Sequence, residues 1–271
     1  MNTKFIIMCA PNGARRTKID HPKIPITAEE IAICAQSVLD AGAALLHVHV
    51  RDSKGAHSLD VDKYRDALSA INSKVGDNLV LQVTTESCGK FSRYDQMQMV
   101  RSLKPEAISL AINEICPDEN TEKEAAKFYS WLNRERIMVQ HILYTPEEVV
   151  RFSLLKERGI IPSQNLFLLF VLGRYTKDLI GDVSELAKFL EVTPEDAIWS
   201  VCCFGSTEYE AVQLASLNGG HARVGFENNL ICFDGSIAID NNVLVDAAAT
   251  LGMTAGRSIA TADDVRNLFV F

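Results

Sequence analysis

Two histidines at the end of an apolar segment have the spacing that points most directly to chemistry. His47 and His49 close the run Ala-Ala-Leu-Leu-His-Val-His-Val-Arg-Asp, which ends at Asp52. If this segment is a β-strand, side chains two residues apart project from one face, so the two imidazoles lie together. Neutral imidazole is a common ligand of transition metals, and a catalytic zinc site needs only three protein ligands. Glu227 can supply the third ligand.

The alternative is that both histidines are core residues satisfied by hydrogen bonds. We favour the metal because burying two adjacent imidazoles in an apolar strand requires several polar partners. Two histidines and one carboxylate leave coordination positions open for substrate oxygens, so the metal can polarise a carbonyl or lower the pKa of bound water to about 7. Arg223, four residues before Glu227, suits a carboxylate of the protein or of the substrate, with a structural ion pair as the alternative.

Short apolar runs alternate with amphipathic segments along the whole chain, which is typical of repeated βα units with a parallel sheet. The predicted strands are residues 5–10, 45–50, 79–84, 107–111, 137–142, 166–172, 197–203 and 222–226. Thr27 with Glu30 forms a predicted capping box, and Thr145 precedes a proline suited to a first helical turn. Further predicted helix caps are Asp60, Thr121, Ser206 and Asn241.

Eight strands and eight helices in 271 residues fit a (β/α)₈ TIM barrel. An open doubly wound sheet is the alternative, and it usually has fewer strands. Because no linker or composition shift divides the chain, we predict one TIM-barrel catalytic domain over residues 1–271.

Charge and composition exclude several classes of function. The chain has 27 basic and 35 acidic residues, a net charge of −8, and no basic run, which argues against nucleic acid or an anionic membrane as partner. No apolar run is long enough to span a bilayer. The 7 cysteines are odd in number and lack Cys-x-x-Cys spacing, so we expect a reducing, cytoplasmic location.

Polar residues follow the predicted strands where a TIM barrel places its active site. Thr84 and Glu86 stand at the end of the third predicted strand, Glu114 follows the fourth and His141 closes the fifth. We therefore expect these side chains to gather at one mouth of the barrel with the histidine pair and with Arg223 and Glu227.

Several motifs resemble those of the zinc-dependent β-keto acid cleavage enzymes, whose best-known member cleaves 3-keto-5-aminohexanoate. The resemblance covers nearly the whole chain. It rests mainly on His-x-His-x-Arg-Asp at residues 47–52 and Gly-Gly-His-x-Arg-Val-Gly-x-Glu at residues 219–227. Pro-Asn-Gly at residues 11–13, the segment 25–31, Val-Leu-Gly at 171–173 and Gly-Arg at 256–257 add to it.

The resemblance implies a TIM barrel, usually a homotetramer, with zinc held by His47, His49 and Glu227. It implies a Claisen-type exchange, in which a β-keto acid and acetyl-CoA give acetoacetate and a new acyl-CoA. Thr84 stands where the family has a serine or threonine near the substrate, and Arg223 matches the family arginine that helps to organise the base.

The chain departs from the family at its proposed active site. Asn228 stands where the family usually has an aspartate, thought to be the general base, and an amide cannot take up a proton at neutral pH. Losing a base should cost about 10² to 10⁴ in rate unless another group replaces it. Arg15 stands near where the best-known member has a glutamate, Glu86 replaces a glycine of the usual Thr-Gly-Gly turn, and Gln140-His141 replace a common Pro-Glu.

Our hypothesis is that Glu86, Glu114 or His141 carries the proton that Asn228 cannot. The alternatives are that the two acids cap helices and that His141 is a buried, hydrogen-bonded residue. Gly205 and Ser206, before a predicted helix, offer backbone amides to the phosphates of CoA, although a simple turn is the alternative.

Two other functions remain open at this point. One is a different zinc-dependent lyase or hydrolase on the same barrel, and the other is a catalytically silent metal-binding protein. Structural zinc normally has four protein ligands, often cysteines, so three ligands without a thiolate argue against the silent protein.

Overall fold

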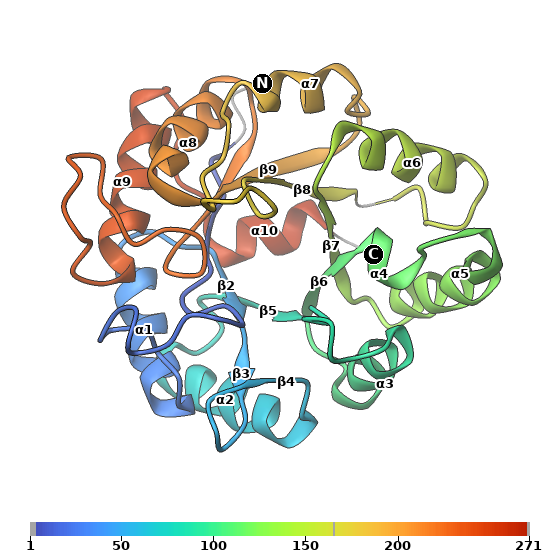
Figure 1. Ribbon diagram of the computed structural model, residues 1–271, viewed down its shortest axis with the longest axis horizontal. Helices are drawn as coiled ribbons and strands as arrows, with labels where there is room; N and C mark the ends of the chain where they lie inside the picture. The colour runs from blue at the N-terminus through green and yellow to red at the C-terminus, as the bar shows by residue number, and fades with distance from the viewer. Residues whose placement is uncertain (1–3, 165, 270–271) are drawn as a thin grey trace.

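The predicted barrel is present in the computed structural model, which describes residues 4–164 and 166–269 (Figure 1). Within these residues eight parallel strands close in the order β1-β10-β9-β8-β7-β6-β5-β2. This confirms the (β/α)₈ fold and excludes the open sheet. The strands are β1 (Ile7–Cys9), β2 (Leu45–Val48), β5 (Val80–Thr84), β6 (Ala107–Ala111), β7 (Met138–Leu143), β8 (Phe167–Leu172), β9 (Ile198–Cys203) and β10 (His221–Val224).

Helices form an outer ring around this barrel, and α10 lies across one end of it (Figure 1). The helices are α1 (Ala28–Asp40), α2 (Val61–Val75), α3 (Arg93–Leu103), α4 (Ile112–Ile115), α5 (Glu119–Arg134), α6 (Pro146–Glu157), α7 (Glu185–Glu191), α8 (Glu208–Leu217), α9 (Asn241–Thr254) and α10 (Ala262–Leu268). A short antiparallel pair, β3 (Val50–Arg51) and β4 (His57–Ser58), extends from the end of β2. No helix within residues 4–164 and 166–269 has the length and apolar character to cross a membrane.

Three of the six predicted caps are confirmed and three are wrong. Thr27, Asp60 and Thr145 accept hydrogen bonds from the first turns of α1, α2 and α6. The other three helices begin at a neighbouring residue: Asp118 caps α5 with Thr121 at its third position, Thr207 precedes α8 in place of Ser206, and Asp240 caps α9 in place of Asn241.

Asn241 is buried because it joins two chain segments below the barrel mouth. Its Oδ1 accepts from the amide of Phe226 at 2.8 Å, and its Nδ2 donates to the carbonyl of Pro11 at 3.2 Å. It therefore ties the segment after β10 to the loop after β1, and both segments lead into the predicted metal site.

The eighth strand is shorter than predicted and does not run straight to Glu227. β10 ends at Val224, and Gly225 has φ of +125°, a conformation that favours glycine. A Cβ at Gly225 would also lie 2.6 Å from the carbonyl oxygen of Ala10. After this turn the amide of Glu227 donates to Ala10 at 3.0 Å, which directs the Glu227 side chain back toward the mouth.

Substitutions of Asn241 and of Asp240, the residue that caps α9, should lower the free energy of unfolding by different amounts. Asn241→Ala leaves the Phe226 amide and the Pro11 carbonyl without their buried partner, so we expect it to lower the free energy of unfolding by about 2–4 kcal/mol. Asp240→Ala removes only the cap of α9 and should cost about 1 kcal/mol. Urea titration of both variants measures the difference, and equal losses would contradict the bridging role.

Candidate metal centre at the mouth of the barrel

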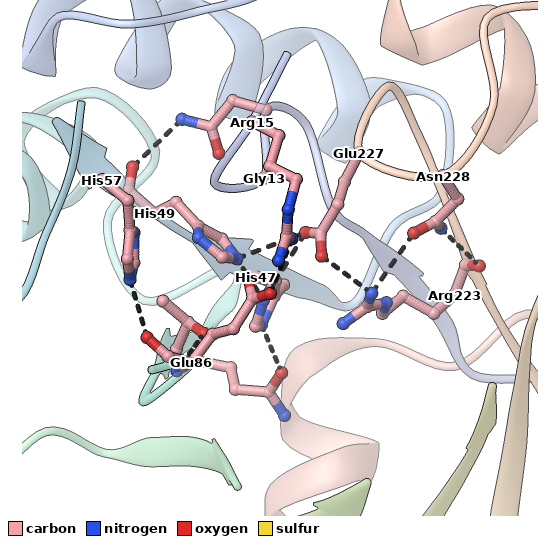
Figure 2. A network of polar contacts seen from close by, with 12 residues as sticks. Gly13, Arg15, His47, His49, His57, Glu86, Arg223, Glu227 and Asn228 are labelled. Carbon is pink, nitrogen blue, oxygen red and sulfur yellow. Dashed lines mark hydrogen bonds and ion pairs between the residues drawn. The ribbon is translucent and has the colours of Figure 1, made fainter. Parts of the chain in front are cut away.

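Three ligand atoms converge where β2 and β10 end. The Nε2 atoms of His47 and His49 lie 3.0 Å apart. Oε2 of Glu227 lies 3.6 Å from the first and 3.4 Å from the second (Figure 2). All three ligand atoms lie within 4.8 Å of one another, so the predicted set is brought together.

These separations fit a metal ion better than they fit hydrogen bonds alone. Atoms bound at about 2.0–2.1 Å to a tetrahedral zinc ion lie about 3.3 Å from one another. Oε2 of Glu227 is buried without a hydrogen-bond partner, although it faces two imidazole nitrogens. Burial lowers the pKa of His47 to about 3, so its ring is neutral and able to bind a metal at neutral pH.

A chain of hydrogen bonds through the barrel interior sets the tautomer of His47. Ser200 donates to the carbonyl of Leu168, and Gln140 donates to the Ser200 hydroxyl at 3.0 Å. Gln82 in turn donates to Gln140 at 3.1 Å and presents its oxygen to Nδ1 of His47 at 2.8 Å. Nδ1 of His47 therefore carries the proton, and Nε2 offers its lone pair to the metal position.

The loop after β1 fixes His49 and packs against Glu227. Nδ2 of Asn12 donates to the carbonyl of His49 at 3.0 Å, and the guanidinium of Arg51 donates to the carbonyls of Gly13 and Arg16. A Cβ at Gly13 would lie 2.5 Å from Cγ of Glu227, so only glycine fits between this loop and the carboxylate.

Arg223 holds the carboxylate from the barrel side. Its Nη2 donates to Oε1 of Glu227 at 3.0 Å and to Oδ1 of Asn228 at 3.2 Å (Figure 2). Burial by itself would raise the pKa of Glu227, but the Arg223 guanidinium together with His49 and His47 outweighs it and brings this pKa well below the ordinary range. Glu227 is therefore ionised, as a metal ligand must be.

Asn228 fits its position as an amide. Its Oδ1 accepts from the Arg223 side chain, and its Nδ2 donates to the Arg223 carbonyl at 3.2 Å. An aspartate in this orientation would place a second acceptor against that carbonyl. The departure from the family pattern is thus matched by the hydrogen bonds of this chain.

Glu86 lies beside the centre but is paired with two arginines. Its Oε1 accepts from Arg15 at 2.8 Å and from Arg174 at 3.3 Å. Its backbone amide donates to Oγ1 of Thr84 at 3.0 Å, so the predicted substrate-side threonine also orders the turn after β5.

The expectation that His141 lies at the mouth is wrong. Gln140 takes the inward position on β7, so alternation turns His141 outward, where its ring centroid lies 4.8 Å from Phe152 on α6 and 5.6 Å from Tyr129 on α5. Burial lowers the pKa of His141 to about 3. It is a residue of the layer between strands and helices.

The remaining predicted residues lie at the strand ends with specific partners. Both carboxylate oxygens of Glu114 accept hydrogen bonds from Ser87, one from its amide and one from its hydroxyl. The amide of Gly205 donates to the carbonyl of Asn228 at 3.2 Å, which removes it from the predicted phosphate site. Ser206 is exposed, and its part in CoA binding stays a prediction.

Sequence reasoning missed the interior chain of Gln82 and Ser200. Each is a polar residue inside an otherwise apolar strand, and this pattern could have indicated a hydrogen-bonded position inside the barrel. A polar side chain at such a position needs a partner across the barrel, and here the partners end at the metal position.

Removing the partner of His47 should weaken the metal centre selectively. Gln82→Leu deletes the acceptor that fixes the His47 tautomer, so we expect zinc affinity to fall about 10–100-fold. Gln140→Met breaks the chain one step further away and should change zinc affinity less than threefold. Competition with a chromophoric chelator measures both, and equal losses would contradict the tautomer role.

His141→Phe should alter acid stability without altering the centre. Because the folded pKa of His141 lies below its ordinary value of about 6.5, its contribution to stability is lost as pH falls from about 6.5 toward 3, at up to 1.4 kcal/mol per pH unit. Between pH 6.5 and pH 5, the free energy of unfolding of the variant, measured by urea titration, should therefore fall by about 2 kcal/mol less than that of the wild type. A loss of zinc binding in His141→Phe would contradict the outward placement.

Known proteins resemble this chain over nearly its whole length. A family model described as beta-keto acid cleavage enzyme matches residues 4–270. A 3-keto-5-aminohexanoate cleavage enzyme of Fusobacterium nucleatum is 31% identical over 99% of this chain and 98% of its own length. A 3-oxoadipate:acetyl-CoA acetyltransferase of Cupriavidus necator is 27% identical over 99% of this chain and 95% of its own length.

Solved structures support the fold. A ternary complex of ObcA with a C4-CoA adduct and oxalate has a TM-score of 0.75 at 17% identity, over 92% of this chain and 68% of that chain. The apo structure of ObcA has a TM-score of 0.73, and this chain spans 65% of its length. The family match over residues 4–270 and the relative that is 31% identical show that the chain belongs to the beta-keto acid cleavage enzyme family.

Proposed function

We propose that the chain is a zinc-dependent β-keto acid cleavage enzyme that uses acetyl-CoA as co-substrate. The observation that supports this most directly is the convergence of three ligand atoms, 3.0–3.6 Å apart, at the carboxyl ends of the barrel strands. The names of the relatives, which include acetyl-CoA transferases of β-keto acids, point to the same chemistry.

The proposed reaction exchanges two acyl groups. C2 of the β-keto acid gives up a proton and forms a bond to the acetyl carbonyl carbon as the bond from that carbon to the CoA sulfur breaks. The CoA sulfur then forms a thioester with the original acyl carbon as the bond from that carbon to C2 breaks, and C2 takes back a proton. The products are acetoacetate and a new acyl-CoA, with no net oxidation. Bound zinc would supply an electrophile that polarises the keto group and stabilises enolate charge.

The chain's own residues would bind the zinc ion and transfer the proton. His47, His49 and Glu227 would bind zinc, while Arg223 keeps Glu227 ionised and oriented. Among the three proton carriers considered, we propose Glu86, because His141 faces outward and Glu114 is bound to Ser87. Glu86 also lies within ion-pair distance of two guanidinium groups, those of Arg15 and Arg174, at the edge of the centre.

A different zinc-dependent lyase or hydrolase is the second candidate, and Asn228 is the observation that favours it. The amide removes the usual family base at the centre, so the metal could serve another reaction. A homotetramer, a CoA-binding role for Ser206 and a cytoplasmic location also remain proposals. The last is supported by the 7 cysteines, all of which are free thiols.

Zinc-loaded protein, acetyl-CoA and a panel of β-keto acids test the function by mass spectrometry of acetoacetate and acyl-CoA. Glu227→Gln should lower zinc affinity at least about 10²-fold, because it removes a charged ligand. We expect no detectable product from this variant. Glu210→Gln, an exposed acid on α8, should change neither. Failure of stoichiometric zinc enzyme to form any product would favour the second candidate.

Two further variants test the proton carrier. Glu86→Gln should lower kcat by about 10² to 10⁴ with zinc content unchanged. Asn228→Asp should raise kcat less than about threefold, because the base already resides elsewhere. A hundredfold gain in Asn228→Asp with little effect of Glu86→Gln would show that the chain lacks a base and that the assignment of Glu86 is wrong.

A further inference from the structure

Two guanidinium groups share one carboxylate oxygen at the edge of the metal centre. Nη1 of Arg15 lies 2.8 Å and Nη2 of Arg174 lies 3.3 Å from Oε1 of Glu86. One carboxylate balances one guanidinium, so this group of three side chains carries a surplus positive charge.

The two arginines differ in how firmly they are held. The Arg174 side chain is 14% exposed, and its guanidinium carbon lies 5.5 Å from the ring centroid of Phe204 and 5.8 Å from that of Tyr175. The Arg15 side chain is 54% exposed. Arg174 is therefore the more buried partner of Glu86, and Arg15 is the partner that solvent, and so a ligand, can reach.

The surplus charge lies next to the proposed substrate position. Arg15 stands two residues after Gly13, and Gly13 packs against Glu227. The carbonyl of Glu86 accepts from Nε2 of His57, whose ring centroid lies 5.3 Å from that of His49. Figure 2 shows the Arg15 and Glu86 side chains reaching into the region of the metal ligands.

We propose that Arg15, supported by Arg174, binds a second anionic group of the substrate, so that the chain acts on β-keto acids with a carboxylate at the far end. The inference rests on the proposed function. A guanidinium forms charge-assisted, often bidentate hydrogen bonds with a carboxylate. A cationic end would meet the surplus positive charge, and a neutral end would leave Arg15 without a new partner.

Three β-keto acids of equal chain length separate these cases: the diacid 3-oxohexanedioate, the neutral-ended 3-oxohexanoate and the cationic 3-keto-5-aminohexanoate. With zinc-loaded protein and saturating acetyl-CoA, we expect kcat/KM for the diacid to exceed that for the neutral-ended acid at least about tenfold. The cationic substrate should be the poorest of the three.

Charge changes at Arg15 test the assignment directly. Arg15→Gln should lower kcat/KM for the diacid about 10–100-fold, mostly through KM, and this loss should exceed the loss for the neutral-ended acid at least about tenfold. Arg15→Glu should reverse the order in favour of the cationic substrate. Arg65→Gln is the matched control, because Arg65 is 57% exposed and also makes an ion pair of 2.8 Å, but on α2.

Several results would overturn the inference while leaving the proposed function intact. These are equal turnover of the diacid and the neutral-ended acid, or equal losses for both in Arg15→Gln. A higher KM for acetyl-CoA in Arg15→Gln, with KM for the diacid unchanged, would assign the anion to the CoA phosphates instead.

Absence of turnover of any β-keto acid would reject the proposed function. Calorimetry tests the anion site even in that case, because it measures binding without turnover. Titration of 3-oxohexanedioate into the wild type and Arg15→Gln should show binding weakened at least about tenfold in the variant. Equal binding by the two proteins, or no binding to the wild type, would reject the anion site.

Discussion

The carboxylate of Glu227 is the group on which the active-site end of this barrel depends. It is placed in a buried position where an ionised carboxylate is stable only with compensating partners. Arg223 provides one on the barrel side, and the nitrogens of His47 and His49 face the other oxygen. The position between Oε2 and these nitrogens has donors and spacing that fit a divalent metal ion, so the charge balance of Glu227 and the candidate metal site depend on the same side chains.

Several distant segments are arranged to keep this carboxylate in place. The turn at Gly225 sends the chain back over the mouth, and Asn241 ties that turn to the loop after β1. Inside the barrel, hydrogen bonds from Ser200 through Gln140 and Gln82 end on His47. Polar residues inside the barrel, which would be costly without partners, here direct one imidazole lone pair toward the metal position.

Charge is distributed unevenly around the mouth. Acidic residues outnumber basic ones in the chain as a whole, yet Arg15, Arg174 and Arg223 meet only Glu86 and Glu227 in the ion pairs of this region. The acids that the sequence placed there as free proton carriers are occupied by arginines or by Ser87. Arg174 is the more buried partner of Glu86, and Arg15 is a cation facing solvent, which suits an anionic substrate.

The sequence by itself predicted the barrel, the strand positions to within two residues and the histidine pair of the candidate centre, because alternating βα patterns and His-x-His spacing are local signals. Tertiary structure decided which polar residues face inward. His141 and Gln140 are neighbours, and only the register of β7 turns one outward and the other into the barrel. It also decided the partners of Glu86, since Arg15 and Arg174 are 71 and 88 residues away in sequence and meet only when the barrel closes.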